Sequence, residues 1–187
     1  MRRFFHLLTC FFLFFSATVS TAQVADRPIG VDEAAIERSD EGLRLAASFH
    51  LELPHELEEV LQRGVPLYFT TELQVYRPRW YWFDVTLVDV SRTVRLTYNA
   101  LTRRYSVSIA GGLQQRVNTL EEALNFVRHP QHWLFDESGL LAENDTYHAA
   151  VRIQLDMSFL PKPFQIDVIN DSTWRLQSDW KHFTFRT

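Results

Sequence analysis

The chain of 187 residues carries 19 basic and 23 acidic side chains, and its formal net charge of −4 argues against nucleic acid as a partner. Its single cysteine, Cys10, lies in the N-terminal segment, so the rest of the chain can hold no disulfide, thiolate metal site or catalytic thiol. A chain of this length can bury enough apolar surface to fold as one domain without such crosslinks.

Residues 1–22 have the pattern of a secretory signal peptide. Two arginines precede an apolar run, and small residues end at Ala22, which predicts cleavage before Gln23 and a periplasmic or secreted protein. The apolar run is shorter than the roughly 20 residues that span a bilayer, so an uncleaved anchor is the weaker alternative. We expect a flexible lead-in over residues 23–30 and a single β-rich domain over residues 31–187.

Apolar and polar residues alternate over residues 43–53, which predicts a strand with one buried face. Residues 31–38 are expected to pair with it through the turn "SDEG", where Gly42 supplies the permissive backbone. A short helix should then begin after Pro54 and end at Gly64.

The next two apolar-alternating stretches predict a hairpin. With a turn at residues 77–79, Val75 would lie opposite Tyr81 and Leu73 opposite Phe83, which matches buried side chains with buried side chains. This register also places Glu72 opposite Asp84, a clash of like charges that a shift of two residues would relieve.

Beyond residue 87 the apolar positions change from odd to even, so we expect a bulge or corner near residues 88–91. A strand follows at residues 105–109. A capping box formed by Thr119 and Glu122 predicts a helix that ends at His129-Pro130. Further strands are expected at residues 147–155, 164–169 and 173–185, with "LPKPF" as a rigid link. The predicted fold class is α+β: predominantly antiparallel β, sandwich- or open-barrel-like, with two short helices in a single domain.

Charge is unevenly distributed along the chain. Acidic residues dominate residues 32–59, whereas arginines dominate residues 77–104, namely Arg77, Arg79, Arg92, Arg95, Arg103 and Arg104. Such a charge dipole can steer a partner, but two solvated faces of a sheet would give the same pattern.

Motifs for catalysis are weak. The pair His129 and His132, with Asp136 and Glu137 nearby, has metal-ligating side chains, but Pro130 breaks the helix between the histidines. A helix-terminal histidine that contacts the last carbonyls is the simpler interpretation. We predict no metal site and no cofactor. A catalytic triad assembled from residues distant in sequence stays open, because triads are defined by geometry.

The segment "RPRWYWFDVTL" provides the best candidate binding surface. Aromatic side chains offer rigid contact area and arginine offers planar hydrogen bonding, so both are enriched where proteins bind partners. The candidate binding residues are Tyr76, Arg77, Arg79, Trp80, Trp82 and Asp84. The alternative is that another layer of the fold covers Trp80 and Trp82, which would make them core residues.

The blocks "LPHELEEVLQRGVPLYF", "RPRWYWFDV", "RLTYNALTRRYSVS", "TLEEALNFV" and "LPKPFQIDVINDSTWRLQSDWKHFTF" resemble those of an exported bacterial family, domain of unknown function 4390. The family is also described as "proline-rich signal peptide protein". The resemblance implies an exported protein whose gene often neighbours a sensor kinase and its response regulator. It transfers no catalytic or binding residue. The family's acidic pair is incomplete here, because Val85 follows Asp84.

We therefore expect a non-catalytic binding module of the cell envelope. The resemblance implies a sensor-kinase ectodomain as a partner, and contact with a membrane surface or a glycan is also compatible with the residues. The alternative function is an envelope hydrolase acting on cell-wall or lipid material. That function would require a cleft that gathers His50, His55 or His148 with carboxylates.

Overall fold

The computed structural model describes residues 27–77, 85–109, 112, 114–130, 133–136, 139–162 and 174–187. The predicted signal peptide, the first half of the lead-in and the tryptophan-rich segment 78–84 lie outside these ranges, as does the predicted strand 164–169.

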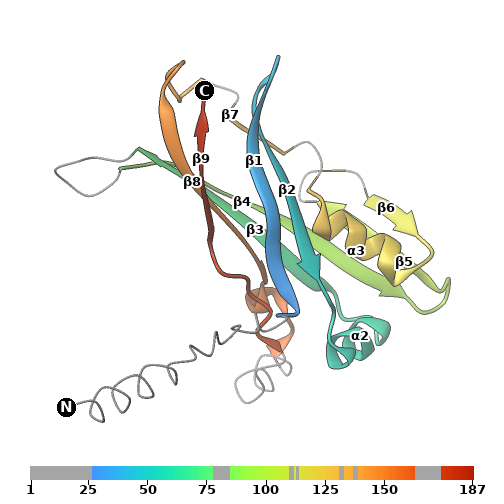
Figure 1. Cartoon of the computed structure of the whole chain (residues 1–187). Helices are drawn as coiled ribbons and strands as arrows, with labels where there is room; N and C mark the ends of the chain where they lie inside the picture. Colours follow the sequence, from blue (N-terminus) through green and yellow to red (C-terminus); the bar gives the residue numbers. More distant parts are fainter. Residues whose placement is uncertain are drawn as a thin grey trace, which may run out of the picture.

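The described residues form two antiparallel sheets (Figure 1). The larger has the strand order β6-β5-β4-β3-β8-β9, with bounds β3 Leu67–Arg77, β4 Val85–Asn99, β5 Arg104–Ile109, β6 Gln114–Val117, β8 Thr146–Leu155 and β9 Lys181–Arg186. The smaller has the order β1-β2-β7, with bounds β1 Ile29–Ser39, β2 Gly42–Leu51 and β7 Trp133–Asp136.

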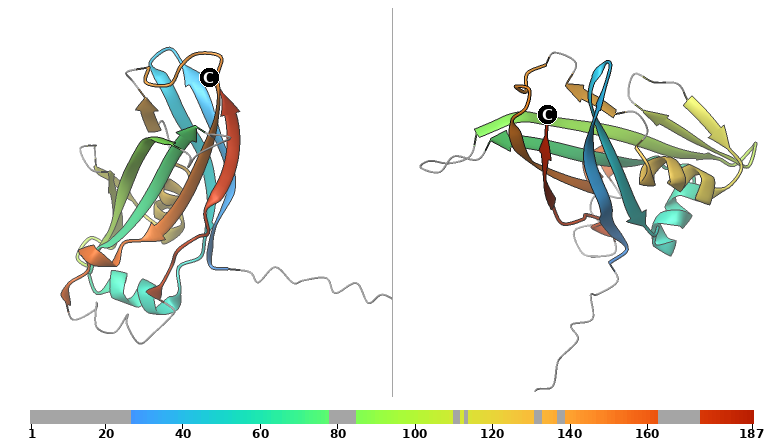
Figure 2. Two further views of the ribbon diagram at one scale, coloured as in Figure 1. Left: turned by 90° about the vertical axis from the view of Figure 1, so that its left-hand side faces the viewer. Right: turned by 45° about the horizontal axis from the view of Figure 1, so that its top comes forward.

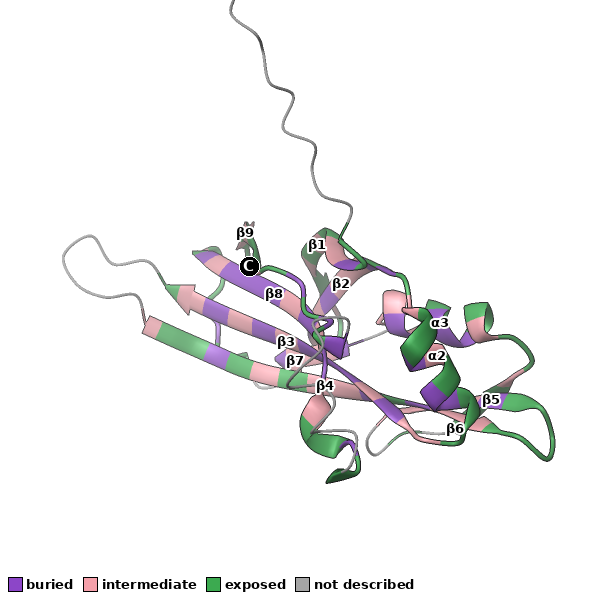
Figure 3. Ribbon diagram, turned by 90° about the horizontal axis from the view of Figure 1, so that it is seen from below, coloured by how far each residue is buried: buried purple, intermediate pink, exposed green. Residues whose placement is uncertain are grey.

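Each strand of the larger sheet turns one face toward the interior. On β3 the odd residues Leu67, Phe69, Leu73 and Val75 are buried, as their alternation predicts, and on β4 the even residues Val88, Val94 and Leu96 are buried. Figure 3 shows this alternation along β3, β4 and β8. We call the buried side the inner face and the opposite side the outer face.

The smaller sheet and two helices cover the inner face (Figures 1 and 2). Strand β1 contacts β8 and β9, while helix α3 (Leu120–Arg128) contacts β2, β5 and β6 and helix α2 (His55–Gln62) contacts β4. Buried residues from both sheets and both helices form one hydrophobic core. A short 3-10 helix, η1 (Met157–Phe159), follows β8. The expected fold class is confirmed: two open, mostly antiparallel sheets with two helices form a single compact domain.

Both predicted helices exist, with the predicted ends. Helix α2 begins after Pro54, and Gly64 adopts a positive φ of 89° just beyond its end. At the start of α3, the hydroxyl of Thr119 accepts a hydrogen bond from Glu122 N (3.1 Å), and the Glu122 carboxylate accepts one from Asn118 N (3.0 Å). His129 caps the other end, and its ring Nδ1 lies 3.2 Å from the Asn125 carbonyl.

The hairpin of β1 and β2 is also confirmed. Ser39 pairs with Gly42, which has a φ of 132°, so the two-residue loop Asp40-Glu41 turns the chain and Gly42 relieves the strain.

The predicted register of the next hairpin is wrong. Val75 pairs with Val88 and Leu73 with Val90, rather than with Tyr81 and Phe83. Glu72 lies opposite Ser91, so the predicted clash with Asp84 does not arise. The physical reason is that the even-numbered apolar side chains of the long strand β4 match the odd-numbered ones of β3 over the whole ladder. Strand β3 ends at Arg77 opposite Val85, and residues 78–84 connect the two strands.

The expected change of face lies at Leu87, one residue before the predicted interval. Val75 pairs with Val88 but Tyr76 pairs with Thr86, which leaves Leu87 as the extra residue of a bulge. The end of the chain also differs from prediction, since β9 begins only at Lys181 and residues 174–180 hold a single bridge at Gln177. Strands β6 and β7 were not predicted, because both are four residues long and show no extended alternation.

The capping box generates a stability prediction. Replacing Thr119 with alanine removes the acceptor for Glu122 N, so we expect the free energy of unfolding to fall by about 1 kcal/mol. Chemical denaturation measures this change. Thr119→Ser is the matched control and should retain most of the stability; equal stability of Thr119→Ala and the unmodified protein would contradict the assigned cap.

Candidate functional site

The outer face of the larger sheet divides into two parts of different electrostatic character. Side chains of β3, β8 and the segment before β9 are engaged with one another. Side chains of β4, β5 and β6 form an open basic pocket.

The engaged part centres on Glu72. Its carboxylate accepts hydrogen bonds from Arg152 (2.8 Å) and from the Gln154 amide (2.6 Å), both on β8. The Arg152 guanidinium also lies over the Trp180 ring, 4.5 Å from its centroid. The side chains of Glu72 and Arg152 are only 20% and 24% exposed, so this ion pair is shielded from water. These groups therefore satisfy each other and hold β3, β8 and residue 180 together.

The basic pocket occupies the other half of the outer face, with a volume of about 680 Å³. Three of its lining residues are arginines on three adjacent strands: Arg95 on β4, Arg104 on β5 and Arg116 on β6. The remaining lining residues are mostly neutral and polar, namely Thr97, Asn99, Thr102, Ser106 and Gln114, with Gly64 and Tyr98. A pocket of this size falls in the range of small-ligand sites.

Strand register explains why the arginines converge. Ser106 pairs with Thr97 on one side and with Arg116 on the other, so directly opposed Cβ atoms are about 5 Å apart. Arg104 precedes Ser106 by two residues and therefore projects from the same face. Arg95 lies two residues from Thr97 and projects from that face as well. The three arginines thus lie on the same face as Ser106 and Thr97, and the Thr97 hydroxyl donates to the Ser106 carbonyl (3.3 Å).

Among the residues that the structure describes, no carboxylate lines this pocket. Among the ion pairs of the described residues, none involves Arg95, Arg104 or Arg116. Arg92, also on β4, does not belong to this group. It lies two residues from Val90 and from Val94, so it shares their inner face, and burial lowers its pKa below the ordinary value. Grouped guanidinium groups without an acid repel one another, and a bound anion would relieve that repulsion. The fixed fork of donors on arginine suits phosphate and carboxylate oxygens in particular.

The structure describes only two of the predicted binding residues, Tyr76 and Arg77. Tyr76 Oη lies 3.0 Å from His182 Nδ1, and its ring packs edge-on against His148. The Arg77 guanidinium donates to Tyr147 Oη (2.8 Å) and pairs with Asp145 (3.1 Å). The hydrogen bond to Tyr147, followed by the charge of Asp145, raises the pKa of Arg77. Both side chains are therefore held at the base of the hairpin. Arg79, Trp80, Trp82 and Asp84 lie outside the described residues, and their role in binding stays a prediction.

The three histidines considered for a hydrolase cleft, His50, His55 and His148, each contact other residues on different elements. His50 on β2 contacts Asp32, and its ring lies across Gly30, where a Cβ would approach the ring to 2.2 Å. His55 pairs with Glu59 within α2, and His148 packs against Tyr76. Each histidine thus has a local contact on a different element.

Of the residues considered as metal ligands, the structure describes His129, at the end of α3, and Asp136, at the end of β7. Asp136 is buried, and its carboxylate accepts hydrogen bonds from Leu140 N (3.1 Å) and Leu141 N (3.3 Å), which fixes the connection after β7. His132 and Glu137 lie outside the described residues. Within the ranges that the structure covers, no group of three metal-ligating side chains is found.

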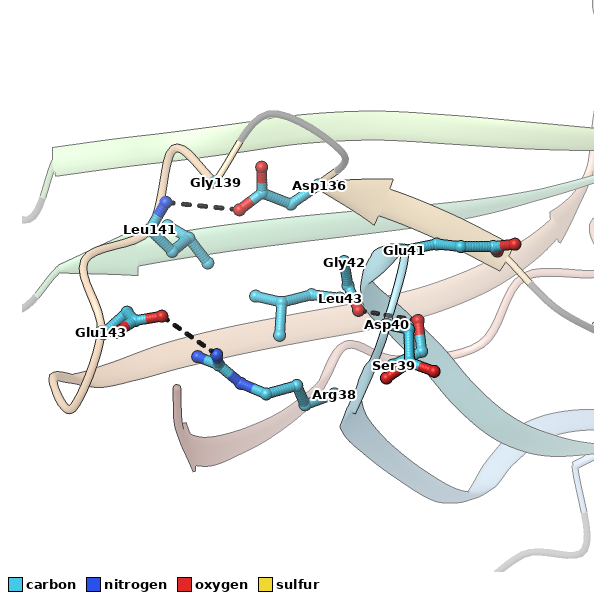
Figure 4. A pocket seen from close by; sticks show the side chains of 10 residues that line it. All are labelled: Arg38, Ser39, Asp40, Glu41, Gly42, Leu43, Asp136, Gly139, Leu141 and Glu143. Atoms are coloured by element: carbon cyan, nitrogen blue, oxygen red, sulfur yellow. Dashed lines mark hydrogen bonds and ion pairs between the residues drawn. The ribbon is translucent and has the colours of Figure 1, made fainter.

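A second pocket, of about 340 Å³, lies between the β1–β2 turn and residues 139–143 (Figure 4). Arg38 and Glu143 form an ion pair across it at 3.3 Å, and Asp136 binds the backbone at its edge. Its one arginine, Arg38, is already paired with Glu143, and Glu41 and Asp136 also have partners within the protein. This pocket is therefore a weaker candidate binding site than the basic pocket.

Sequence reasoning missed the basic pocket. The excess of arginines over residues 77–104 was the available signal, and it includes Arg95 and Arg104. Arg116 could not be assigned to the same face, because β6 was not predicted. The pairing of β4, β5 and β6 is what turns a general excess of charge into a site.

The ion pair between Glu72 on β3 and Arg152 on β8 generates a prediction about coupling energy. In a double-mutant cycle of Glu72→Ala and Arg152→Ala, we expect a coupling of about 1–3 kcal/mol in the free energy of unfolding. The matched control is the pair of Glu59 on α2 and Arg63 at the end of that helix, whose side chains are 47% and 68% exposed and whose coupling should stay below about 0.5 kcal/mol. Equal coupling of the two pairs would contradict the assigned role of Glu72.

None of the helices among the described residues is long and apolar enough to span a bilayer. Searches of curated proteins and of solved structures each return no match. A family model does match, over residues 26–184, which is most of the chain. This protein therefore belongs to the DUF4390 family, a domain of unknown function.

Proposed function

We propose that this protein is an exported, non-catalytic binding module of the cell envelope, and that its basic pocket binds an anionic group of an envelope component. The single observation that carries the proposal is the cluster of Arg95, Arg104 and Arg116 in a pocket whose described lining residues include no carboxylate. The signal-peptide pattern of residues 1–22 supports export.

The chemistry of the pocket favours phosphate or carboxylate as the recognised group. Three guanidinium groups supply charge and paired donors, and the hydroxyls of Thr102 and Ser106 supply further donors. A neutral ligand would leave the mutual repulsion of the arginines uncompensated. A protein partner, including the sensor-kinase ectodomain that the family resemblance implies, would have to present carboxylates or phosphates here.

Binding is favoured over hydrolysis because the pocket offers charge and hydrogen-bond donors, while the histidines His50, His55 and His148 are engaged elsewhere on three different elements. General acid–base chemistry requires a titratable group within hydrogen-bond reach of the reacting atom. Arginine stays protonated and is suited to holding an anion in place.

The test uses inorganic pyrophosphate as a probe in calorimetric titrations. Arg104→Gln should weaken binding about tenfold or more, because it removes a charged hydrogen-bond partner. Arg104→Lys should give an intermediate affinity, because it keeps the charge but loses the paired donors. Binding should weaken with added salt.

Arg186→Gln is the matched control, since Arg186 is exposed on β9, at the opposite edge of the same sheet, and its replacement changes the net charge equally. It should bind pyrophosphate as the unmodified protein does. Arg104→Gln should also unfold at the same or a slightly higher temperature, because it removes repulsion. Unchanged affinity in Arg104→Gln would overturn the proposed function.

A further inference from the structure

The β4–β5 turn places a solvent-exposed leucine at the edge of the basic pocket. Leu101 is 96% exposed, the highest value among the large hydrophobic side chains of the described residues. Its neighbours Asn99 and Thr102 line the pocket, and Arg104 begins the next strand. An apolar tip and a group of arginines thus share one end of the molecule.

The exposure of Leu101 is built into the turn. The Asn99 side chain accepts hydrogen bonds from both Leu101 N and Thr102 N, each at 3.0 Å, which closes the turn. Arg103 then adopts a left-handed backbone with a φ of 53°. This geometry holds the leucine away from the core, so its exposure is not the result of a missing contact within a loose loop.

A second apolar side chain flanks the pocket near Arg95. Phe159 on η1 is 53% exposed and stacks on the Tyr68 ring with centroids 4.7 Å apart. The Arg95 guanidinium lies 5.9 Å from the centroid of the same Tyr68 ring. Arg95 is therefore placed between a half-exposed aromatic pair and the pocket.

Arginines beside protruding apolar side chains match the chemistry of an anionic bilayer surface. Guanidinium groups bind headgroup phosphates, while leucine and phenylalanine enter the boundary between headgroups and acyl chains. A soluble anionic glycan would neutralise the arginines but would not remove the exposed Leu101 side chain from water. The combination therefore favours a lipid surface over a sugar polymer.

We propose that the β4–β5 turn docks on an anionic lipid bilayer, with Leu101 inserted and Arg95, Arg104 and Arg116 on headgroup phosphates. This inference rests on the proposed anion-binding function and names its ligand as the phosphate of a membrane lipid. The docking is peripheral and reversible, because one leucine and a few arginines give limited membrane affinity.

Cosedimentation with vesicles tests the inference. The unmodified protein should bind vesicles that contain phosphatidylglycerol and phosphatidylethanolamine, should bind phosphatidylcholine vesicles far less, and should be released by salt. Leu101→Ser should reduce vesicle affinity about tenfold, because it removes the apolar side chain at the tip of the turn, while leaving pyrophosphate affinity unchanged. Leu140→Ser is the matched control: Leu140 is 70% exposed, lies in the connection between β7 and β8, and should not affect vesicle binding.

The outcomes separate this inference from the proposed function. Vesicle affinity that is equal in Leu101→Ser and in the unmodified protein would overturn insertion of the turn. Binding of pyrophosphate and soluble glycerol phosphate without binding of vesicles would also overturn it, and would identify a free anion as the ligand. If the unmodified protein did not bind pyrophosphate, the proposed function itself would be overturned.

Discussion

One-sided burial of the six-stranded sheet is the constraint on which the rest of the structure depends. The smaller sheet and the helices α2 and α3 cover its inner face, and the apolar side chains of every strand must follow that face. The alternation on β3 and β4, the bulge at Leu87 and the long pairing of the two strands all satisfy this requirement. The outer face is then left to polar side chains, which must pair with one another or remain open to water and ligands.

The outer face shows both solutions. Between β3 and β8, Glu72 is held by Arg152 and Gln154, so charge is neutralised within the protein. Between β4 and β6, Arg104 and Arg116 have no such carboxylate among the described residues. A structural role explains the first arrangement, because it joins strands that are distant in sequence. The second does not join elements in this way, and the repulsion of its charges is the physical reason for assigning it to a ligand.

Local patterns predicted the fold well. Alternation was sufficient for the β1–β2 hairpin and its Gly42, and the capping box at Thr119 identified α3, because each depends on residues close in sequence. The β3–β4 register could not be derived in the same way, because two pairings with similar local matches compete and only the full length of β4 decides between them. The candidate site was even harder to predict from the sequence. It requires the registers of three strands at once, and β6, which contributes Arg116, shows too little alternation to be recognised as a strand.

The most direct test of the anion-binding account is a nuclear magnetic resonance titration of arginine side-chain Nε–Hε signals with inorganic pyrophosphate. The account predicts that the signals of Arg95, Arg104 and Arg116 shift together and saturate at one ligand concentration, because one pocket holds all three. The signal of Arg152, which is already bound to Glu72, should stay in place. Saturable shifts at other arginines, with these three unaffected, would contradict the account.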